Sequence, residues 1–199
     1  MKILLIGASG TIGKAVNAAL QDEHDVITVN YSGDGLNVDL GNSDSIRQLF
    51  KEVGSVDAII STAGLANFAP LEKLTDADYQ LALSNKLMGQ VNLVRLAGSV
   101  LNEGGSVTLT SGVLSRQPIP GSASISMVNG ALESYVKAAV LELSAYRVNV
   151  VAPVFVKETM EMMGMDSGTG LSAADTAKAY VAAVEGSMTG ETLDAPEYA

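Results

Sequence analysis

The chain has 199 residues with no cysteine, one histidine and a net charge of −10 at pH 7, a length that suits one domain spanning residues 1–199. The composition excludes disulfides, thiolate metal sites and a histidine-based triad, and we expect no bound metal. The 12 basic residues are scattered and no apolar run is long enough to span a bilayer, so we expect a cytoplasmic protein without a nucleic-acid or membrane partner.

The first predicted elements are a strand over residues 2–6, a glycine-containing loop and a helix over 12–20. The apolar strand leads directly into Gly7-Ala8-Ser9-Gly10-Thr11-Ile12-Gly13. Glycines at the end of a buried strand let backbone N–H groups and a helix N-terminus approach a pyrophosphate. The spacing is G-x-x-G-x-x-G and not the common G-x-G-x-x-G, and a tight turn without a ligand is the alternative. The context favours a dinucleotide site.

Strand and helix patterns then alternate along the chain, and several strands are continuous apolar runs. Such runs are typical of a parallel sheet with helices on both faces. The sequence therefore predicts an α/β fold, a Rossmann-like doubly wound parallel sheet in three α/β/α layers. Strand ends near Gly7, Ser61, Ser111 and Pro153 should border one crevice. The further expected strands are 26–30, 57–61, 105–110 and 146–152, and the further expected helices are 43–53, 76–101 and 122–144.

Two segments outside the predicted sheet carry additional expectations. The helical pattern over 122–144 is apolar around much of its circumference, which suggests that one face packs on the sheet and another forms a subunit contact. We therefore expect a homo-dimer or homo-tetramer. The segment 156–170 contains several Met and Gly residues without clear periodicity, which suits a mobile loop over the crevice, with an ordinary linker as the alternative.

Motifs at the strand ends support a family assignment. They are Ser61-Thr62-Ala63-Gly64 after one strand, Thr108–Gly112 at the end of the next, Arg147–Pro153, and Thr189–Leu193 before a last strand. Together with the glycine loop, their order and spacing over almost the whole chain resemble the short-chain dehydrogenase/reductase family. The resemblance implies an NAD(P)-dependent oxidoreductase acting on a small carbonyl compound or alcohol. We expect cofactor contacts from Gly7, Ser9, Gly10, Thr11, Ile12, Gly13, Asn30, Tyr31, Ser32, Asp39, Leu40, Ser61, Thr62, Ala63, Gly64 and Pro153.

The second strand bears on the choice between NAD and NADP. An NAD enzyme often has an acidic residue at the end of this strand to bind the ribose 2′-hydroxyl, but the strand ends in Asn30-Tyr31-Ser32. Asn30, Ser32 and Ser9 could instead bind a 2′-phosphate, although no arginine is nearby. The sequence favours NADP, while Asp34 keeps NAD as the alternative. Asp39 resembles the family's acidic residue that meets the adenine amine.

The reactive positions depart from the family pattern. Family members use a Tyr and a Lys in Y-x-x-x-K, with a Ser and an Asn, because a phenol with a pKa near 10 needs a neighbouring cation to act at neutral pH. Here the resemblance places Ser111 at the Ser position, Ile125 at the Tyr position and Asn129 at the Lys position. The family's N-x-x-G corresponds to Lys86-Leu87-Met88-Gly89, and a shift of one residue would place Asn85 there instead.

We hypothesise that Lys86 replaces the missing ammonium group and, with Ser111 and Asn129, forms the catalytic site. The alternative for Lys86 is an ordinary solvated helix lysine. Two functions follow: a reductase with a nonstandard acid, or a dinucleotide-binding protein that has lost the chemistry and has a regulatory or subunit role. Isomerisation or a nucleotide-sugar reaction on the same scaffold is a third, weaker alternative that no residue selects.

Overall fold

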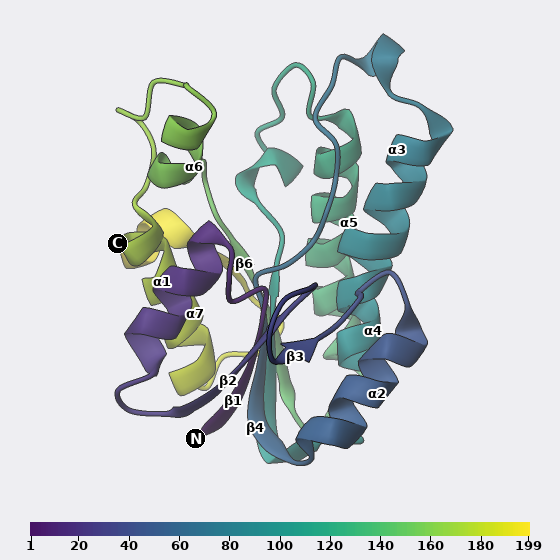
Figure 1. Ribbon diagram of the computed structural model, residues 1–199, viewed down its shortest axis with the longest axis vertical. Helices are drawn as coiled ribbons and strands as arrows, with labels where there is room; N and C mark the ends of the chain where they lie inside the picture. The colour runs from purple at the N-terminus through teal and green to yellow at the C-terminus, as the bar shows by residue number, and fades with distance from the viewer.

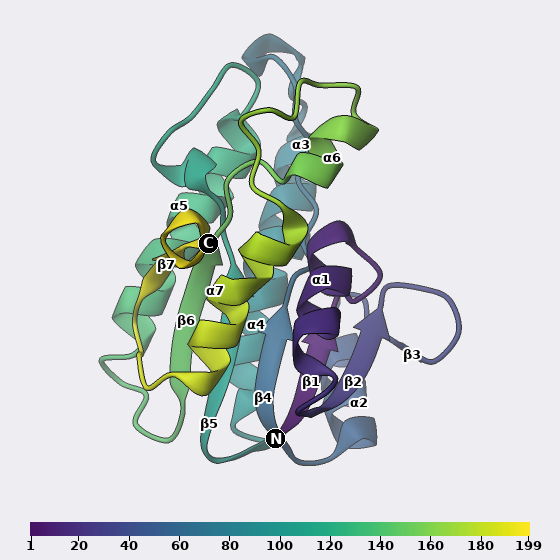
Figure 2. The same ribbon diagram turned by 90° about the vertical axis from the view of Figure 1, so that its left-hand side faces the viewer.

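The computed structural model describes residues 1–199 and contains a seven-stranded parallel sheet in the order β3-β2-β1-β4-β5-β6-β7 (Figure 2). The order reverses direction between β1 and β4, so the predicted Rossmann-like doubly wound α/β fold is confirmed. The strands are β1 Lys2–Ile6, β2 Asp25–Asn30, β3 Leu36–Asn37, β4 Val56–Ser61, β5 Leu101–Thr110, β6 Arg147–Ala152 and β7 Thr192–Asp194. The helices are α1 Thr11–Leu20, α2 Ser43–Val53, α3 Asp76–Leu81, α4 Met88–Ala97, α5 Ala123–Ala139, α6 Lys157–Met162 and α7 Ala173–Glu185.

Helices cover both faces of the sheet. Figure 1 shows α1 and α7 on one side and α2, α4 and α5 on the other. Strand β1 serves both layers through its two-residue alternation: Ile3 and Leu5 belong to the apolar cluster under α1 and α7, whereas Leu4 and Ile6 belong to the cluster under α2, α4 and α5. This explains why β1 is a continuous apolar run. None of the helices has both the length and the apolar composition needed to cross a membrane.

Local capping determines which helix boundaries could be read from the sequence. Helix α2 matches its expected range because the Asn42 side chain accepts a hydrogen bond from Asp44 N–H and Gly54, with φ +69°, follows the last turn. The expected helix over 122–144 was too long, since α5 ends at Ala139. The chain then turns toward β6 without a glycine or proline to mark the end, and Leu141 is left 84% exposed.

The segment expected as a single helix over 76–101 has a different structure. A π-helical stretch over Ala82–Leu87 joins α3 to α4, and α4 already ends at Ala97. Strand β5 begins at Leu101, four residues before the expected start, and its pairing with β4 shifts register between Val56 and Ala58. A β-bulge of this kind lets a strand accommodate extra residues, here around Gly104 with φ +75°.

The segment 156–170, expected as a mobile loop over the crevice or as an ordinary linker, contains the short helix α6. A β-bridge between Val156 and Leu171 closes the segment at its base, and the Glu158 carboxylate accepts hydrogen bonds from Ala173 N–H at the start of α7. The expectation that the whole segment is loop or linker was therefore wrong for residues 157–162. Six residues are too few for hydrophobic periodicity to mark a helix. Figure 1 shows α6 above the end of the sheet that carries the glycine loop.

A buried hydrogen-bonded chain lies beneath this end of the sheet, and we predict a modest stability effect from shortening it. The Tyr180 hydroxyl lies 2.7 Å from Thr110 Oγ1, which donates to the Ser61 carbonyl at 2.6 Å. Tyr180→Phe removes one hydrogen bond from a fully buried side chain but leaves Thr110 its own acceptor. We expect a loss of about 1 kcal/mol in the free energy of unfolding, measured by urea denaturation. Tyr198→Phe at the C-terminus is the control. Equal stability of the two variants would mean that the hydrogen bond between Tyr180 and Thr110 does not stabilise the protein.

Candidate functional site

Two cavities lie at the carboxyl ends of the strands and share the residues Thr62 and Gly64. The first has a volume of about 290 Å³ and lies between the glycine loop and the end of β2. The second has a volume of about 360 Å³ and lies between β5, α5 and the segment that follows β6. Because they meet at the residues after β4, they form one continuous crevice at the point where the strand order reverses. Of the strand-end residues predicted to border it, Gly7, Ser111 and Pro153 line the cavities, whereas Ser61 is fully buried.

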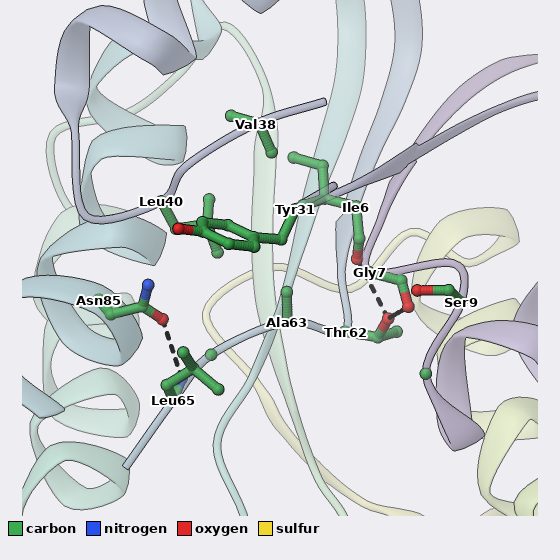
Figure 3. A pocket seen from close by; sticks show the side chains of 12 residues that line it. Ile6, Gly7, Ser9, Tyr31, Val38, Leu40, Thr62, Ala63, Leu65 and Asn85 are labelled. Carbon is green, nitrogen blue, oxygen red and sulfur yellow. Dashed lines mark hydrogen bonds between the residues drawn. The ribbon is translucent and has the colours of Figure 1, made fainter. Parts of the chain in front are cut away.

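The first cavity is lined by the glycine loop and by apolar side chains (Figure 3). Tyr31, at the end of β2, extends toward Leu40 with Val38 and Ala63 on either side in this view. Thr62 Oγ1 donates to the carbonyls of Ile6 and Gly7 at 3.1 and 3.2 Å and so fixes the glycine loop against the end of β4. Of the predicted cofactor contacts, the cavity lining includes Gly7, Ser9, Gly10, Tyr31, Leu40, Thr62, Ala63 and Gly64.

The start of α1 is open to an anion. Gly10 is the N-cap, no side chain caps the first turn, and the turn contains no acidic residue. The N–H groups of Thr11, Ile12 and Gly13 therefore lack a side-chain partner at the positive end of the helix dipole. Gly13 itself packs under the loop, because a Cβ at this position would lie 2.0 Å from the Gly7 carbonyl oxygen. Glycine at this position is thus required for the loop to fold back onto the helix.

The end of β2 is oriented by one hydrogen bond. Ser9 N–H donates to Asn30 Oδ1 at 2.8 Å, which leaves the Asn30 amide hydrogens available to another acceptor. Like Asn30, the predicted contacts Thr11, Gly13, Ser32, Asp39 and Ser61 are absent from the lining of both cavities, and Ser61 is fully buried. Ser32 is exposed, and the Asp39 carboxylate accepts from Gly41 N–H at 2.9 Å within its own turn. Their expected cofactor roles therefore have no support from the cavity geometry.

The π-helical stretch explains why the sequence could not distinguish Asn85 from Lys86. In an α-helix two successive side chains point about 100° apart, whereas an inserted π-turn shifts the side chains that follow it around the helix. Here both residues reach the crevice. Asn85 Oδ1 accepts from Leu65 N–H at 2.9 Å beside the first cavity, and Lys86 lines the second. Gly64 makes room for Lys86, since a Cβ there would lie 2.9 Å from Lys86 Cγ.

Lys86 is buried, with 6% of its surface exposed, so the alternative of a solvated helix lysine is wrong. Its Nζ donates to the backbone carbonyls of Thr110 and Ser111 at 3.3 and 3.4 Å and pairs with no carboxylate. Burial disfavours the charged form and lowers the pKa of Lys86 from 10.5 to about 8. The second cavity thus contains an ammonium group without a counter-ion.

Ser111 and Asn129, the other two predicted catalytic residues, line the same cavity as Lys86. Asn129 Nδ2 donates to the Gly112 carbonyl at 3.4 Å, while its Oδ1 is buried without a hydrogen-bond partner. An unpaired acceptor in this place is costly unless an occupant of the cavity supplies a donor. Ile12, Ile125 and Pro153 also contribute to the lining.

Glu133, which was not predicted from the sequence, contacts Ser111 of the second cavity. It lies on α5, is 7% exposed, and accepts hydrogen bonds from Ser111 Oγ at 3.0 Å and Ser115 Oγ at 2.6 Å. Arg116 Nε lies 3.4 Å from its second oxygen, and Arg116 also pairs with Asp194 at the end of β7. The available signal was its spacing: Glu133 follows Asn129 by four residues and so shares its helix face.

Sequence comparisons relate the chain to known proteins. The family model described as enoyl-(acyl carrier protein) reductase matches residues 8–187. The short-chain dehydrogenase/reductase ATR9 from Stachybotrys chlorohalonatus is 32% identical over 129 residues, which cover 60% of this chain and 51% of ATR9. The versicolorin reductase stcU from Emericella nidulans is 26% identical over 183 residues, which cover 79% of this chain and 69% of that protein. The chain thus spans about half the length of ATR9 and more of stcU.

Solved structures share the fold over nearly the whole chain. The crystal structure of the protein lin1944 from Listeria innocua superposes with a TM-score of 0.93 at 41% identity and covers 98% of both chains. The crystal structure of a small-chain dehydrogenase in complex with NADPH superposes with a TM-score of 0.86 at 26% identity, covering 98% of this chain and 95% of that one. In both structures the part that superposes on this chain includes the strands and helices that form the crevice.

Proposed function

Because the chain belongs to the short-chain dehydrogenase/reductase family, we propose that it is an oxidoreductase that uses NADP(H) to interconvert a small carbonyl compound and its alcohol. The observation that carries this proposal is the continuous crevice. It runs from the uncapped start of α1, where a pyrophosphate would bind, to a cavity that contains Lys86, Ser111 and Asn129.

The residues present fit a nicotinamide dinucleotide. Gly7 and Gly10 leave the backbone accessible at the start of α1, and Tyr31 and Leu40 offer an apolar surface for an adenine ring. At the other end, the unpaired Asn129 Oδ1 can accept a hydrogen bond from a ribose hydroxyl. When bound, the nicotinamide supplies or accepts the hydride.

Lys86 is proposed to supply the proton in place of the missing tyrosine phenol. Hydride addition to a carbonyl group leaves negative charge on the oxygen, and a buried ammonium stabilises that charge more strongly than a solvated one. A pKa of about 8 keeps Nζ mostly protonated at neutral pH while making the proton easier to release than from an ordinary lysine. Lys86 can therefore hold the proton at Nζ and transfer it to the reduced oxygen.

Two observations support NADP as the cofactor. The end of β2 lacks an acidic side chain, and Asn30 can direct its amide hydrogens at a 2′-phosphate because its Oδ1 already accepts from Ser9 N–H. In addition, a related small-chain dehydrogenase was solved with NADPH. An amide donor binds an anionic phosphate better than it binds a hydroxyl group.

We expect Asn30→Asp to reverse the cofactor preference. The new carboxylate has the same shape and can still accept from Ser9 N–H, but it replaces two amide hydrogens with an acceptor that repels a phosphate and binds a ribose hydroxyl. The ratio of the NADH to the NADPH dissociation constant should fall by about tenfold or more, as measured by fluorescence titration. Gln48→Glu on the exposed side of α2 adds the same charge as a control. An unchanged ratio in Asn30→Asp would locate 2′-phosphate recognition elsewhere.

A single experiment tests the function as a whole. Purified protein is titrated with NADPH and NADH, and NADPH oxidation is then followed with a panel of aldehydes, ketones and quinones. Binding of NADPH together with turnover of at least one carbonyl compound supports the proposal. Binding without turnover favours the second candidate, a dinucleotide-binding protein with a regulatory or subunit role, which the apolar Ile125 at the position of the phenol supports. Absence of binding contradicts both candidates.

A further inference from the structure

The hydroxyl group of Ser111 has only acceptors around its hydrogen. Its Oγ lies 3.0 Å from Glu133 Oε1 and 3.4 Å from the Val151 carbonyl oxygen. An ionised carboxylate and a carbonyl group can only accept hydrogen bonds, so the Ser111 hydrogen is donated to one of these two. Toward the cavity Ser111 therefore presents lone pairs and acts as an acceptor.

The surroundings of Glu133 keep this arrangement in place. Arg116 Nε lies 3.4 Å from Glu133 Oε2, and Ser115 Oγ donates to Oε1 at 2.6 Å. An ionised carboxylate beside a cation and a second hydroxyl donor has no hydrogen to give back to Ser111. Arg116 is in turn anchored by Asp194, so the cation is not free to leave.

The direction of this hydrogen bond determines where the reacting oxygen can bind. That oxygen gains negative charge during hydride transfer and would be repelled by the lone pairs of Ser111. It must face Lys86 Nζ, the charged donor of the cavity. The unpaired Asn129 Oδ1 can be satisfied by a cofactor ribose hydroxyl. The lone pairs of Ser111 Oγ, whose hydrogen is donated to Glu133 or Val151, then remain to accept a hydrogen bond from a donor on the substrate.

We propose that Glu133 fixes Ser111 as a hydrogen-bond acceptor and that the protein thereby selects α-hydroxy ketones and α-hydroxy aldehydes. This inference rests on the proposed function. The carbonyl carbon accepts a hydride from NADPH, the carbonyl oxygen accepts a proton from Lys86 Nζ, and the products are a 1,2-diol and NADP⁺. Lys86 regains its proton from water. The substrate's hydroxyl group donates to Ser111 and is unchanged by the reaction.

The test uses pairs of ketones that differ by one hydroxyl group: 3-hydroxybutan-2-one with butan-2-one, and 2-hydroxyacetophenone with acetophenone. A plain ketone offers no donor to Ser111 Oγ and forgoes this hydrogen bond, so kcat/KM for NADPH oxidation should be about tenfold or more higher for the hydroxy ketone of each pair. In Glu133→Gln the side-chain amide can donate to Ser111, which frees the hydroxyl to donate into the cavity. The ratio within each pair should then fall close to one.

Glu142→Gln, an exposed substitution shortly after α5, makes the same change in charge and should keep the wild-type ratio. Circular dichroism and NADPH titration establish that Glu133→Gln is folded and binds cofactor. If it does not fold, Ser111→Ala replaces it, with the same expected loss of the ratio. Equal turnover of both ketones of a pair by the wild type would overturn the inference and leave the proposed function intact. If no aldehyde, ketone or quinone of the panel supports NADPH oxidation, both the proposed function and this inference are overturned.

Discussion

Lys86→Met is expected to stabilise the protein and to lower its reductase activity strongly. The ammonium group of Lys86 is buried without a counter-ion, and the difference between its pKa of about 8 and the ordinary 10.5 corresponds to about 3 kcal/mol. Methionine keeps the apolar stem that packs on Gly64 but carries no charge. Loss of the proposed proton donor should lower kcat for NADPH-dependent carbonyl reduction by about 10²–10⁴-fold.

The pH dependence of this stabilisation identifies its cause. Because the folded-state pKa lies below the unfolded-state pKa, the unfolded chain binds the Lys86 proton more tightly than the folded one. The full penalty is present below pH 8, and the wild type becomes more stable as the pH rises from about 8 to 10.5. The advantage of Lys86→Met in urea denaturation should therefore be largest at pH 7 and should disappear near pH 10.5.

Lys137→Met is the matched control, because Lys137 is exposed on α5 and loses the same charge without leaving a buried site. It should change neither stability nor turnover appreciably. If Lys86→Met is less stable than the wild type at pH 7, another interaction in solution offsets the cost of burying the ammonium group. Full reductase activity in that variant would exclude Lys86 as the proton donor.

The fold was predictable because its main elements follow local rules. The apolar alternation of β1, the Asn42 cap of α2 and the glycines of the first loop each act within a few residues of the chain. The errors arose where tertiary contacts decide the structure. The end of α5 has no glycine or proline signal, and β3 contains two residues, too few for any periodic pattern.

Residues that line the second cavity could be predicted from the sequence, but their hydrogen bonds could not. Lys86, Ser111 and Asn129 could be selected from motif positions, and they line one cavity. The burial of Lys86 depends on a π-turn and on its contact with Gly64, and neither leaves a pattern in the sequence. Glu133 was missed because its partners Ser111 and Arg116 come from segments far apart along the chain. Pairings of this kind form only when the chain is folded, so no local pattern marks them.

The glycine loop leads to a second large prediction, in which two substitutions separate folding from binding. A Cβ at Gly13 would lie 2.0 Å from the Gly7 carbonyl oxygen and 2.8 Å from its carbonyl carbon, a backbone contact that no side-chain rotation can relieve. A Cβ at Gly10 would meet only the Gly7 oxygen at 3.4 Å, and Gly10 has φ −72°, which alanine adopts readily.

We therefore expect Gly13→Ala to lower the free energy of unfolding by about 3 kcal/mol or more and to abolish NADPH binding. Gly10→Ala should unfold within about 0.5 kcal/mol of the wild type and yet bind NADPH at least about tenfold more weakly, because its methyl group lies where a pyrophosphate approaches the start of α1. Urea denaturation and fluorescence titration of both variants measure the two effects separately. Wild-type NADPH affinity in Gly10→Ala would mean that the phosphates do not bind at this loop, and the crevice would then have to serve a ligand without a pyrophosphate.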